Sequence, residues 1–317
     1  MSELLFDFTR DGVYLSDCTH VLGPLRQTLE ELAHKGLLAS PVESLQKLGY
    51  HYNRAVEPGT DLTAFVAPLI QSLLDGCKNP SAFVVHHSYA ASTSDAIPTD
   101  NRELLARARY FPASLLRRFE IDHVPYWGSY TSGCTGLMSL ITLAAGILRA
   151  ANTDKVLCLT ADLKPCDTTY DGVREKLLTS DAASGFLVGR EPQGYQVLGV
   201  AQYSSSREII PWLEVVKRAV QMTQQLCELT GVPSNGDVGM VCHYPNMFVE
   251  AWQLVSHFLK VPKENAIIDG MAERAHCLSS DAVISLETYH GSEPVHAVYS
   301  FGSGLHLAIA LLRKVDK

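Results

Sequence analysis

The feature that most restricts the fold of this chain is a regular alternation of short apolar segments with longer amphipathic ones. Runs such as "SAFVVHHSY" and "KVLCLTAD" are typical of buried strands, whereas "LTAFVAPLIQSLLDG" and "LMSLITLAAGILR" have helical spacing. Strands that alternate with helices predict a mostly parallel sheet with helices on its faces. The expected fold class is therefore α/β.

The alternation occurs twice, in the same order. "VGMVCHYPN" corresponds to "SAFVVHHSY", and "PVHAVYSFGSGLHLAIALLRK" corresponds to "KVLCLTAD" followed by "ASGFLVGR". This order indicates a diverged internal duplication. A chain of 317 residues is long enough for one layered unit made of two such halves. We expect the halves to cover residues 1–205 and 206–317, joined near "YSSSREIIPW".

Composition excludes several classes of protein. The formal net charge of −8 makes a nucleic-acid partner unlikely, because phosphate binding needs concentrated Lys and Arg. No apolar stretch stands out as long enough for a membrane span, and the start "MSELLFDFTRDG" carries acids where a secretion signal carries bases. The eight cysteines form no CxxC pair, so no metal site is expected. We expect a cytoplasmic protein with no membrane partner.

Cys134 stands between small and hydroxyl residues, in "YTSGCTG", directly before a predicted helix over residues 137–149. The preceding "TSG" offers a capping hydroxyl, and free N–H groups at a helix start favour the thiolate form of a cysteine. Gly133 and Gly136 would leave room for an acyl group beside the sulfur. The alternative is that Cys134 is a small buried residue at a strand-to-helix turn.

Two histidines occupy positions where they could reach Cys134. His243 ends the apolar run "MVCH", at the carboxyl edge of a predicted strand, where open α/β sheets bind ligands. It could equally be a core histidine that is hydrogen-bonded to the backbone. His276 lies in the polar turn "ERAHCLSSD", and Ser279, Ser280 and Asp281 are candidate caps of the helix that follows.

Packing of the two halves about a pseudo-twofold axis would bring both histidine turns to Cys134. The three side chains would then supply a nucleophile, a proton-transfer group and a hydrogen-bond donor. Gly302 and Gly304, in "SFGSG", would let the backbone approach a bound group closely and offer N–H groups to an oxyanion. His86 and His87 lack this convergent placement and are expected to be structural.

Taken together, these stretches resemble the thiolase superfamily, most closely its β-ketoacyl carrier-protein synthase III branch. The resemblance covers nearly the whole chain, in order and spacing. It rests on five motifs: the nucleophilic cysteine in "SGCTG", a Gly-Asp-Gly-Ala-like turn in "SDAASGFLVG", a His-Gln-Ala-Asn motif in "HYPN", an Asn-Thr-Ser-Ala-Ala-Ser motif in "HCLSSD" and a closing Phe-Gly-Gly-Gly in "FGSG". The resemblance implies a five-layered αβαβα fold from two pseudo-duplicated halves, catalytic Cys134 and His243, and usually a dimer.

Three departures from the family pattern bear on function. His276 takes the place of the family's Asn, although an ungapped alignment would put Ala275 there, and the resulting Cys-His-His set resembles the chain-elongating ketosynthases. Ser303 replaces a middle glycine, and its backbone N–H would hold the oxyanion together with that of Cys134. Phe248 replaces an Arg used near the pantetheine phosphate or carrier protein, which implies a different acyl donor or carrier, as in specialised metabolism.

The resemblance thus implies an acyltransferase that works through a thioester on Cys134. In the leading hypothesis, His243 and His276 hold a malonyl-type thioester during decarboxylative condensation. In the alternative, His243 is the general base for ester or amide formation on an alcohol or amine. A third possibility is a noncatalytic subunit of a thiolase-fold heterodimer.

The ligand expected is an acyl thioester of CoA or of a carrier protein, with no further cofactor. A homodimer is expected, and a heterodimer remains possible. The expected substrate-binding residues are Asn246, Phe248, Gly302 and Gly304.

Overall fold

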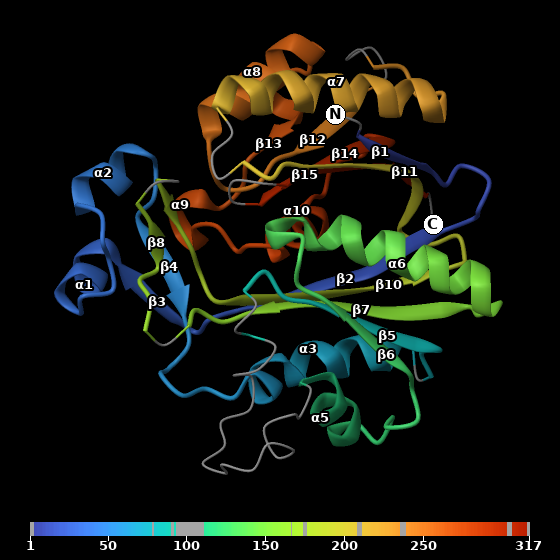
Figure 1. Cartoon of the computed structure of the whole chain (residues 1–317), viewed down its shortest axis with the longest axis horizontal. Coiled ribbons are helices and arrows are strands. Elements are labelled where there is room, and N and C mark those ends of the chain that lie inside the picture. The colour runs from blue at the N-terminus through green and yellow to red at the C-terminus, as the bar shows by residue number, and fades with distance from the viewer. Residues whose placement is uncertain are drawn as a thin grey trace.

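The computed structural model of the chain describes residues 3–77, 79–89, 92, 111–165, 167–173, 176–207, 211–234, 239–302 and 306–315. In these ranges an 11-stranded sheet, β13-β12-β14-β15-β11-β2-β10-β7-β5-β6 with β1 beside β11, dominates the fold. Figure 1 shows that this sheet doubles over into two stacked layers. The layers are joined where β11 pairs with β2, through only Tyr195↔Leu15 and Gln196↔Tyr14.

The lower layer in Figure 1 comes from the N-terminal half of the chain. Its strands are β2 (Tyr14–Leu22), β5 (Ala82–His86), β6 (Tyr126–Ser129), β7 (Lys155–Asp162) and β10 (Ala182–Gly189). Strands β5, β6 and β7 are parallel, and β10 is antiparallel to both β7 and β2. The strands predicted over "SAFVVHHSY" and "KVLCLTAD" are therefore present.

The upper layer repeats this arrangement. Its strands are β1 (Leu4–Asp7), β11 (Tyr195–Ser204), β12 (Met240–His243), β13 (Ala266–Ile267), β14 (Val295–Gly302) and β15 (His306–Lys314). Strands β12, β13 and β14 are parallel, and β15 is antiparallel to β14 and β11. The strand order mirrors that of the lower layer, which confirms the duplication. The expected boundary at residue 205 lies just after β11, so the upper layer takes this strand from before that boundary.

Helices complete five layers (Figure 1). The outer helices below are α3 (Leu62–Gly76) and α5 (Phe111–Arg118), and those above are α7 (Trp212–Thr230) and α8 (Val249–Leu259). Between the two sheet layers lie α6 (Gly136–Ala151) and α10 (Ser280–Thr288). The αβαβα fold implied by the family resemblance is thus confirmed. The mostly parallel sheet predicted from the strand–helix alternation is wrong, because β10 pairs antiparallel with β7 and β2, and β15 pairs antiparallel with β14 and β11.

Helix α6 is apolar on most of its surface because it is enclosed by both sheets. Its Leu137 and Ile141 belong to one core cluster with Val156 of the lower layer and Val298 of the upper layer. The helical segment Gly133–Ala151 is long and apolar enough, by length and composition, to cross a membrane, with a mean hydropathy of 1.6. The expectation that no stretch reaches this length is therefore wrong. Burial in the protein core accounts for the apolar surface of this helix.

A small lobe projects from the side of the layers (Figure 1, left). It contains β3 (Leu25–Thr28), α1 (Leu29–His34), α2 (Val42–Lys47), β4 (Tyr52–Ala55), β8 (Asp171–Gly172) and β9 (Leu177–Leu178), with α9 (Met271–Arg274) beside it. The sequence "LRQTLEELAHKG" predicts a helix over residues 25–36, but the structure divides this segment: a strand comes first, and the helix begins after Thr28, which forms a capping box with Glu31. The sequence also predicts a polar loop over "ASTSDAIPTDN" (91–101) and a helix over "ELLARARY" (103–110), which lie outside the described residues apart from Ser92.

Candidate active site

Cys134 lies in a single 3-10 turn, η2 (Gly133–Thr135), that leads directly into α6. Its exposed fraction is 7%. Gly133 precedes it with φ +51°, in the left-handed region that favours glycine. The end of β14 approaches closely, since a Cβ on Gly302 would lie 3.1 Å from the Cys134 backbone nitrogen. The sequence-predicted position of Cys134 at the start of a helix is confirmed.

The turn is held by residues from two distant segments. Ser279 Oγ donates to the Gly133 carbonyl (3.1 Å) and accepts from the Gly136 N–H (3.2 Å), so it caps α6 rather than its own helix. His86 also hydrogen-bonds the Gly133 carbonyl, through Nε2 at 2.7 Å. A Cβ on Gly136 would lie 2.3 Å from His86 Cδ2. The space at Gly136 is thus filled by His86, and the expectations of an acyl group there and of a cap from "TSG" are corrected.

His276 interacts with Cys134 from the turn before α10. Its side chain is fully buried, and its Nδ1 donates to Asp281. Its Nε2 forms no hydrogen bond with any described residue, yet Cys134 is near enough to affect its titration. Burial lowers the pKa of His276, but the Asp281 carboxylate and Cys134 outweigh burial and raise it to about 10. An imidazolium beside the sulfur is therefore favoured at neutral pH.

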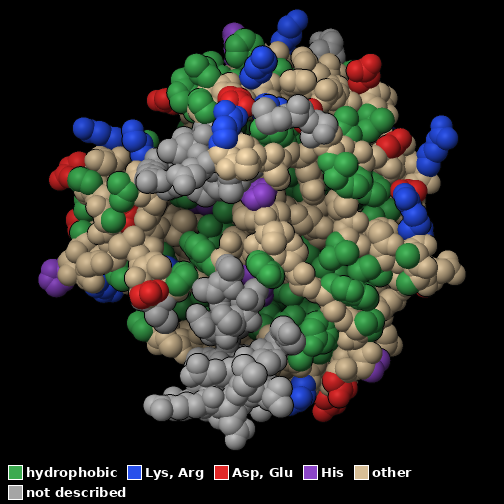
Figure 2. Space-filling model, viewed as in Figure 1, with side chains coloured by type: hydrophobic (Ala, Val, Ile, Leu, Met, Phe, Trp, Pro, Cys, Tyr) green, Lys and Arg blue, Asp and Glu red, His purple; other side chains and the backbone are tan. Residues whose placement is uncertain are grey.

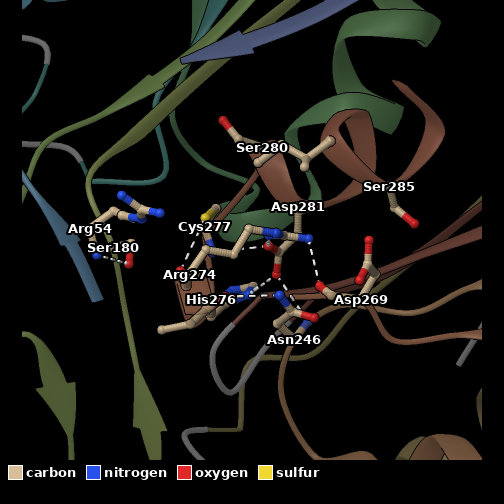
Figure 3. Close-up of polar contacts among 12 residues, drawn as sticks. Arg54, Ser180, Asn246, Asp269, Arg274, His276, Cys277, Ser280, Asp281 and Ser285 are labelled. Carbon is tan, nitrogen blue, oxygen red and sulfur yellow. Dashed lines mark hydrogen bonds and ion pairs between the residues drawn. The ribbon is translucent and has the colours of Figure 1, made fainter. Parts of the chain in front are cut away.

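Asp281 is the centre of the polar cluster drawn in Figure 3. Its Oδ1 accepts from Arg274 and from the Cys277 N–H (3.0 Å). Its Oδ2 accepts from His276 and from the Asn246 N–H (3.0 Å). Burial opposes ionisation, but the charges of His276 and Arg274 hold the pKa of Asp281 well below its ordinary value. The sequence suggested Asp281 only as a helix cap, so its bond to His276 was missed.

Asn246 belongs to the frame of this cluster. Its Nδ2 donates to the Ala275 carbonyl (2.9 Å), and its own carbonyl accepts from the Tyr50 hydroxyl (2.9 Å). The side chain is 1% exposed. These contacts help to fix the Asp281 position, whereas the Asn246 side-chain Oδ1 is buried and has no hydrogen-bond partner among the described residues, so substrate binding by Asn246 stays a prediction.

His243 is not part of the Cys134 cluster. Its Nδ1 hydrogen-bonds Ser285 Oγ (2.7 Å), and its Nε2 hydrogen-bonds His296 Nδ1 (3.0 Å). His296 Nε2 lies 2.9 Å from the Glu293 carbonyl, so it must donate there. His296 Nδ1 then accepts from His243 Nε2, and His243 Nδ1 accepts from Ser285.

This chain of donors keeps both imidazoles neutral. Burial, with the neighbouring His296, lowers the pKa of His243 to about 3, and burial lowers that of His296 to about 4. The grouping of His243 with Cys134 is thus corrected: both ring nitrogens are already bonded in the core. The alternative of a core histidine fits, with side-chain partners in place of backbone.

Tyr89 is a further neighbour of Cys134 that the sequence did not single out. Burial raises the pKa of its phenol, and the charges of Asp162, Cys134 and Asp181 raise it further, while a hydrogen bond with Thr179 lowers it. No spacing signal distinguishes this tyrosine, which follows β5 in "HHSY".

The structure describes some of the remaining predicted site residues and leaves others outside its described ranges. Phe248 precedes α8 with φ 51° and packs edge-on against Phe301, with ring centroids 5.8 Å apart. Ser303 and Gly304 lie outside the described residues. Among the described residues, no group of three or more His, Cys, Asp and Glu side chains could hold a metal ion.

Comparisons with known proteins extend this picture. No protein-family model matches the chain, and no curated protein matches its sequence. Solved structures match over nearly the whole length. The 3-oxoacyl-[acyl-carrier-protein] synthase III of Aquifex aeolicus has a TM-score of 0.71 and 14% identity, covering 95% of this chain and 99% of that chain. The chain has the thiolase-like synthase III fold.

Two other structures share this synthase III fold. ChlB3, described as an "aceyltransferase", has a TM-score of 0.75 and 16% identity, covering 96% of this chain and 98% of that chain. OleA from Xanthomonas campestris, solved with lauric acid and lauroyl-CoA, has a TM-score of 0.70 and 12% identity, covering 95% and 98%. Identities this low establish the fold, so the chemistry must be argued from the residues of this chain.

Proposed function

We propose that this protein transfers acyl groups through a thioester on Cys134, with His276 as the acid–base group. The observation that carries the proposal is the position of His276 between the Asp281 carboxylate and Cys134, with no other partner for Nε2 among the described residues. A cysteine and a histidine oriented by a carboxylate form a nucleophile, its base and the group that fixes the base.

The first half-reaction loads the enzyme. With the proton on His276 Nε2, the Cys134 sulfur attacks the carbonyl carbon of an acyl thioester. A new C–S bond forms as the old one breaks, and the departing thiol takes the proton from His276. Cys134 is then an uncharged thioester, and His276 is neutral because its proton has left with the thiol.

The second half-reaction returns the proton. A hydroxyl or amine attacks the acyl-Cys134 carbonyl and gives its proton to His276 Nε2. The C–S bond breaks, and its electron pair returns to the sulfur. Asp281 keeps the proton of His276 on Nδ1 and stabilises the imidazolium that forms. The initial state of the pair is restored.

The backbone around Gly302 supports an oxyanion site. The end of β14 packs against the Cys134 nitrogen, so that a side chain at position 302 would crowd it. We propose that the N–H groups of Cys134 and Ser303 hold the tetrahedral oxyanion.

Transfer to an alcohol or amine is favoured over decarboxylative condensation, which the sequence put first. That reaction was expected to use two imidazoles to hold the malonyl-type thioester, and His243 is bonded elsewhere. Asp281 makes the remaining imidazole a strong proton acceptor, as general-base transfer requires. The intact Cys134, His276 and Asp281 cluster also argues against a noncatalytic subunit.

A dimer is proposed through β6. Tyr126 and Trp127 on this strand are 38% and 43% exposed, and β6 ends the strand order of the lower layer. Exposed aromatic side chains on a terminal strand favour pairing with a second chain. Light scattering of the purified chain tests this, and a monomer that persists at high protein concentration contradicts it.

Paired donors test the reaction. The purified chain is incubated with acetyl-CoA and malonyl-CoA, and both carbon dioxide and acyl-Cys134 are measured. We expect acetyl-Cys134 without malonyl-dependent carbon dioxide, and no adduct in the Cys134→Ala variant. Carbon dioxide release that requires Cys134 would establish condensation instead.

A further inference from the structure

We propose that a cavity linked to the catalytic cluster through Tyr170, Thr179 and Asp181 binds the acyl acceptor, and that this acceptor is a neutral hydroxylated small molecule. The cavity has a volume of about 870 Å³ and lies between the side lobe of Figure 1 and residues 163–170. Its size is that of a small-molecule site. The inference rests on the acyl transfer proposed above and names the class of its second substrate.

The cavity is lined by a buried amide oxygen with no hydrogen-bond partner among the described residues. Gln27, on β3, lines the cavity with 7% exposure, and its Oε1 has no hydrogen-bond partner among the described residues. Its cross-strand neighbour Asn53 is 0% exposed, and both polar atoms of the Asn53 side chain are unpaired in the same part of the chain.

A buried amide oxygen that has lost its water and gained no hydrogen bond destabilises the folded chain. A ligand hydroxyl that bonds Gln27 would remove this destabilisation. A hydrocarbon chain would leave the amide unpaired, so Gln27 selects against an acyl chain as occupant. The remaining walls are largely apolar and include Leu25, Leu37, Val56, Leu62 and Leu163.

The charges around the cavity favour an uncharged ligand. Two basic residues, Lys35 and Lys164, line the cavity together with three acidic ones, Glu57, Asp167 and Asp181. Lys164 Nζ is already bonded to the carbonyls of Pro165 (2.7 Å) and Thr168 (2.8 Å). A phosphate-bearing carrier would therefore find little free positive charge. Figure 2 likewise shows basic and acidic side chains interspersed on this face, with no large basic patch among those drawn in colour.

The inner wall of the cavity is joined to the catalytic cluster. Tyr170 lines the cavity, and its hydroxyl donates to Asp181 Oδ2 (2.7 Å). Its carbonyl accepts from Thr179 N (2.8 Å) and Thr179 Oγ1 (2.7 Å). Thr179 forms a parallel β-bridge with His276. The segment that carries Asp181 into the cavity thus runs beside the proposed catalytic base.

Tyr89 lies near residues of both sites. It lies within electrostatic range of Cys134 and also of the cavity residues Asp181 and Tyr170. A hydroxyl at the inner end of the cavity would thus approach the acyl-Cys134 carbonyl past Tyr89, with His276 available to accept its proton.

The test separates loading from transfer. Acetyl-Cys134 is formed on the full chain with the N-acetylcysteamine thioester of acetate and freed of donor by gel filtration. Its loss is followed by intact-protein mass spectrometry with increasing methyl α-D-glucopyranoside, a neutral polyol, as the probe. Gln27→Met and Gln27→Glu are compared with Gln71→Met, which removes an exposed amide that bonds Asp75 on α3.

The probe is expected to accelerate deacetylation saturably in the wild type and in Gln71→Met. In Gln27→Met the ratio of deacetylation to loading should fall about tenfold, within the range that loss of one buried hydrogen bond produces. The ratio of deacetylation to loading should also fall in Gln27→Glu. Formation of acetyl-Cys134 in the two variants shows that both of them fold.

Three results would overturn the inference while the proposed function stands: no acceleration of a wild-type acetyl-enzyme, full acceleration in Gln27→Met, or faster loading of an octanoyl than an acetyl thioester in Gln27→Met. The last would show that the cavity holds the acyl chain. If no acetyl-enzyme forms at all, the proposed function fails and this inference fails with it.

Discussion

Replacing Asp281 with Asn tests whether the carboxylate, rather than the shape of the site, sets the chemistry of His276. The four described donors that surround Asp281 include two cations, His276 and Arg274. The His276 pKa of about 10, against an ordinary 6.5, corresponds to a preference of about 5 kcal/mol for the imidazolium. The Asp281→Asn variant keeps the side-chain volume at position 281 but removes most of the preference of His276 for its protonated form. The pKa of His276 should therefore fall toward or below 6.5.

Two consequences follow for the variant. Arg274 becomes a buried cation without its partner, so the free energy of unfolding should fall by about 3–5 kcal/mol. An amide can also hold the wrong tautomer of His276, so acylation of Cys134 at pH 7 should slow by roughly 10²–10⁴-fold, as in serine-protease triads. Its pH–rate profile should move by several pH units.

The assay is the rate of acetyl-Cys134 formation between pH 5 and 10, measured by intact-protein mass spectrometry on samples whose folding is checked by circular dichroism. Asp269→Asn is the matched control. It removes an exposed carboxylate from the same region, where Arg274 bonds the Asp269 backbone carbonyl. A folded Asp281→Asn variant with the wild-type rate and profile would refute the assigned relation between Asp281 and His276.

Three further outcomes are expected. His243→Asn should lower the free energy of unfolding by about 1–3 kcal/mol in urea titrations, because it disturbs buried hydrogen bonds, yet leave acylation within a few-fold of wild type; a loss like that of His276→Asn would contradict this. Gly302→Ala should slow acylation and lower the free energy of unfolding by about 1–3 kcal/mol, since its Cβ would crowd the Cys134 nitrogen, and an unchanged rate would count against the oxyanion site. The unfolding free energy should peak near neutral pH: the raised pKa of His276 gives stability that is present below pH 6.5 and lost as pH rises toward 10, whereas the lowered pKa of His243 removes stability as pH falls from 6.5 toward 3. A profile that keeps rising from pH 7 to 10 would contradict the His276 assignment.

The repeated strand–helix order was sufficient to predict an α/β fold made of two similar halves, because hydrophobic periodicity depends on burial along each element, whereas the five layers were expected from the resemblance to the thiolase superfamily. Cys134 was also placed correctly, since a helix start follows from local residue types. The choice between His243 and His276 was not predictable in the same way. His243 ends an apolar strand and His276 lies in a turn, and neither pattern shows what the imidazole is bonded to. Their hydrogen-bond partners, Ser285 and His296 for His243 and Asp281 for His276, decide which imidazole is free to act on Cys134.

The sequence predictions differ from the structure at two further features, the cap of α6 and the side lobe, for a similar reason. Ser279 looked like a cap for its own helix, but it caps α6, whose sequence position is about 140 residues away. The side lobe was missed because β3 and β4 are only four residues long, too short for a clear period. Contacts between distant segments, rather than local pattern, determine both features.

The central claim is tested most directly by locating the acyl group after the purified chain reacts with an acyl thioester. Peptide mapping by mass spectrometry should find a single acyl adduct on Cys134, formed much more slowly in His276→Asn and at nearly the wild-type rate in His243→Asn. An adduct on another cysteine, or acylation that depends on His243 and not on His276, would contradict the account.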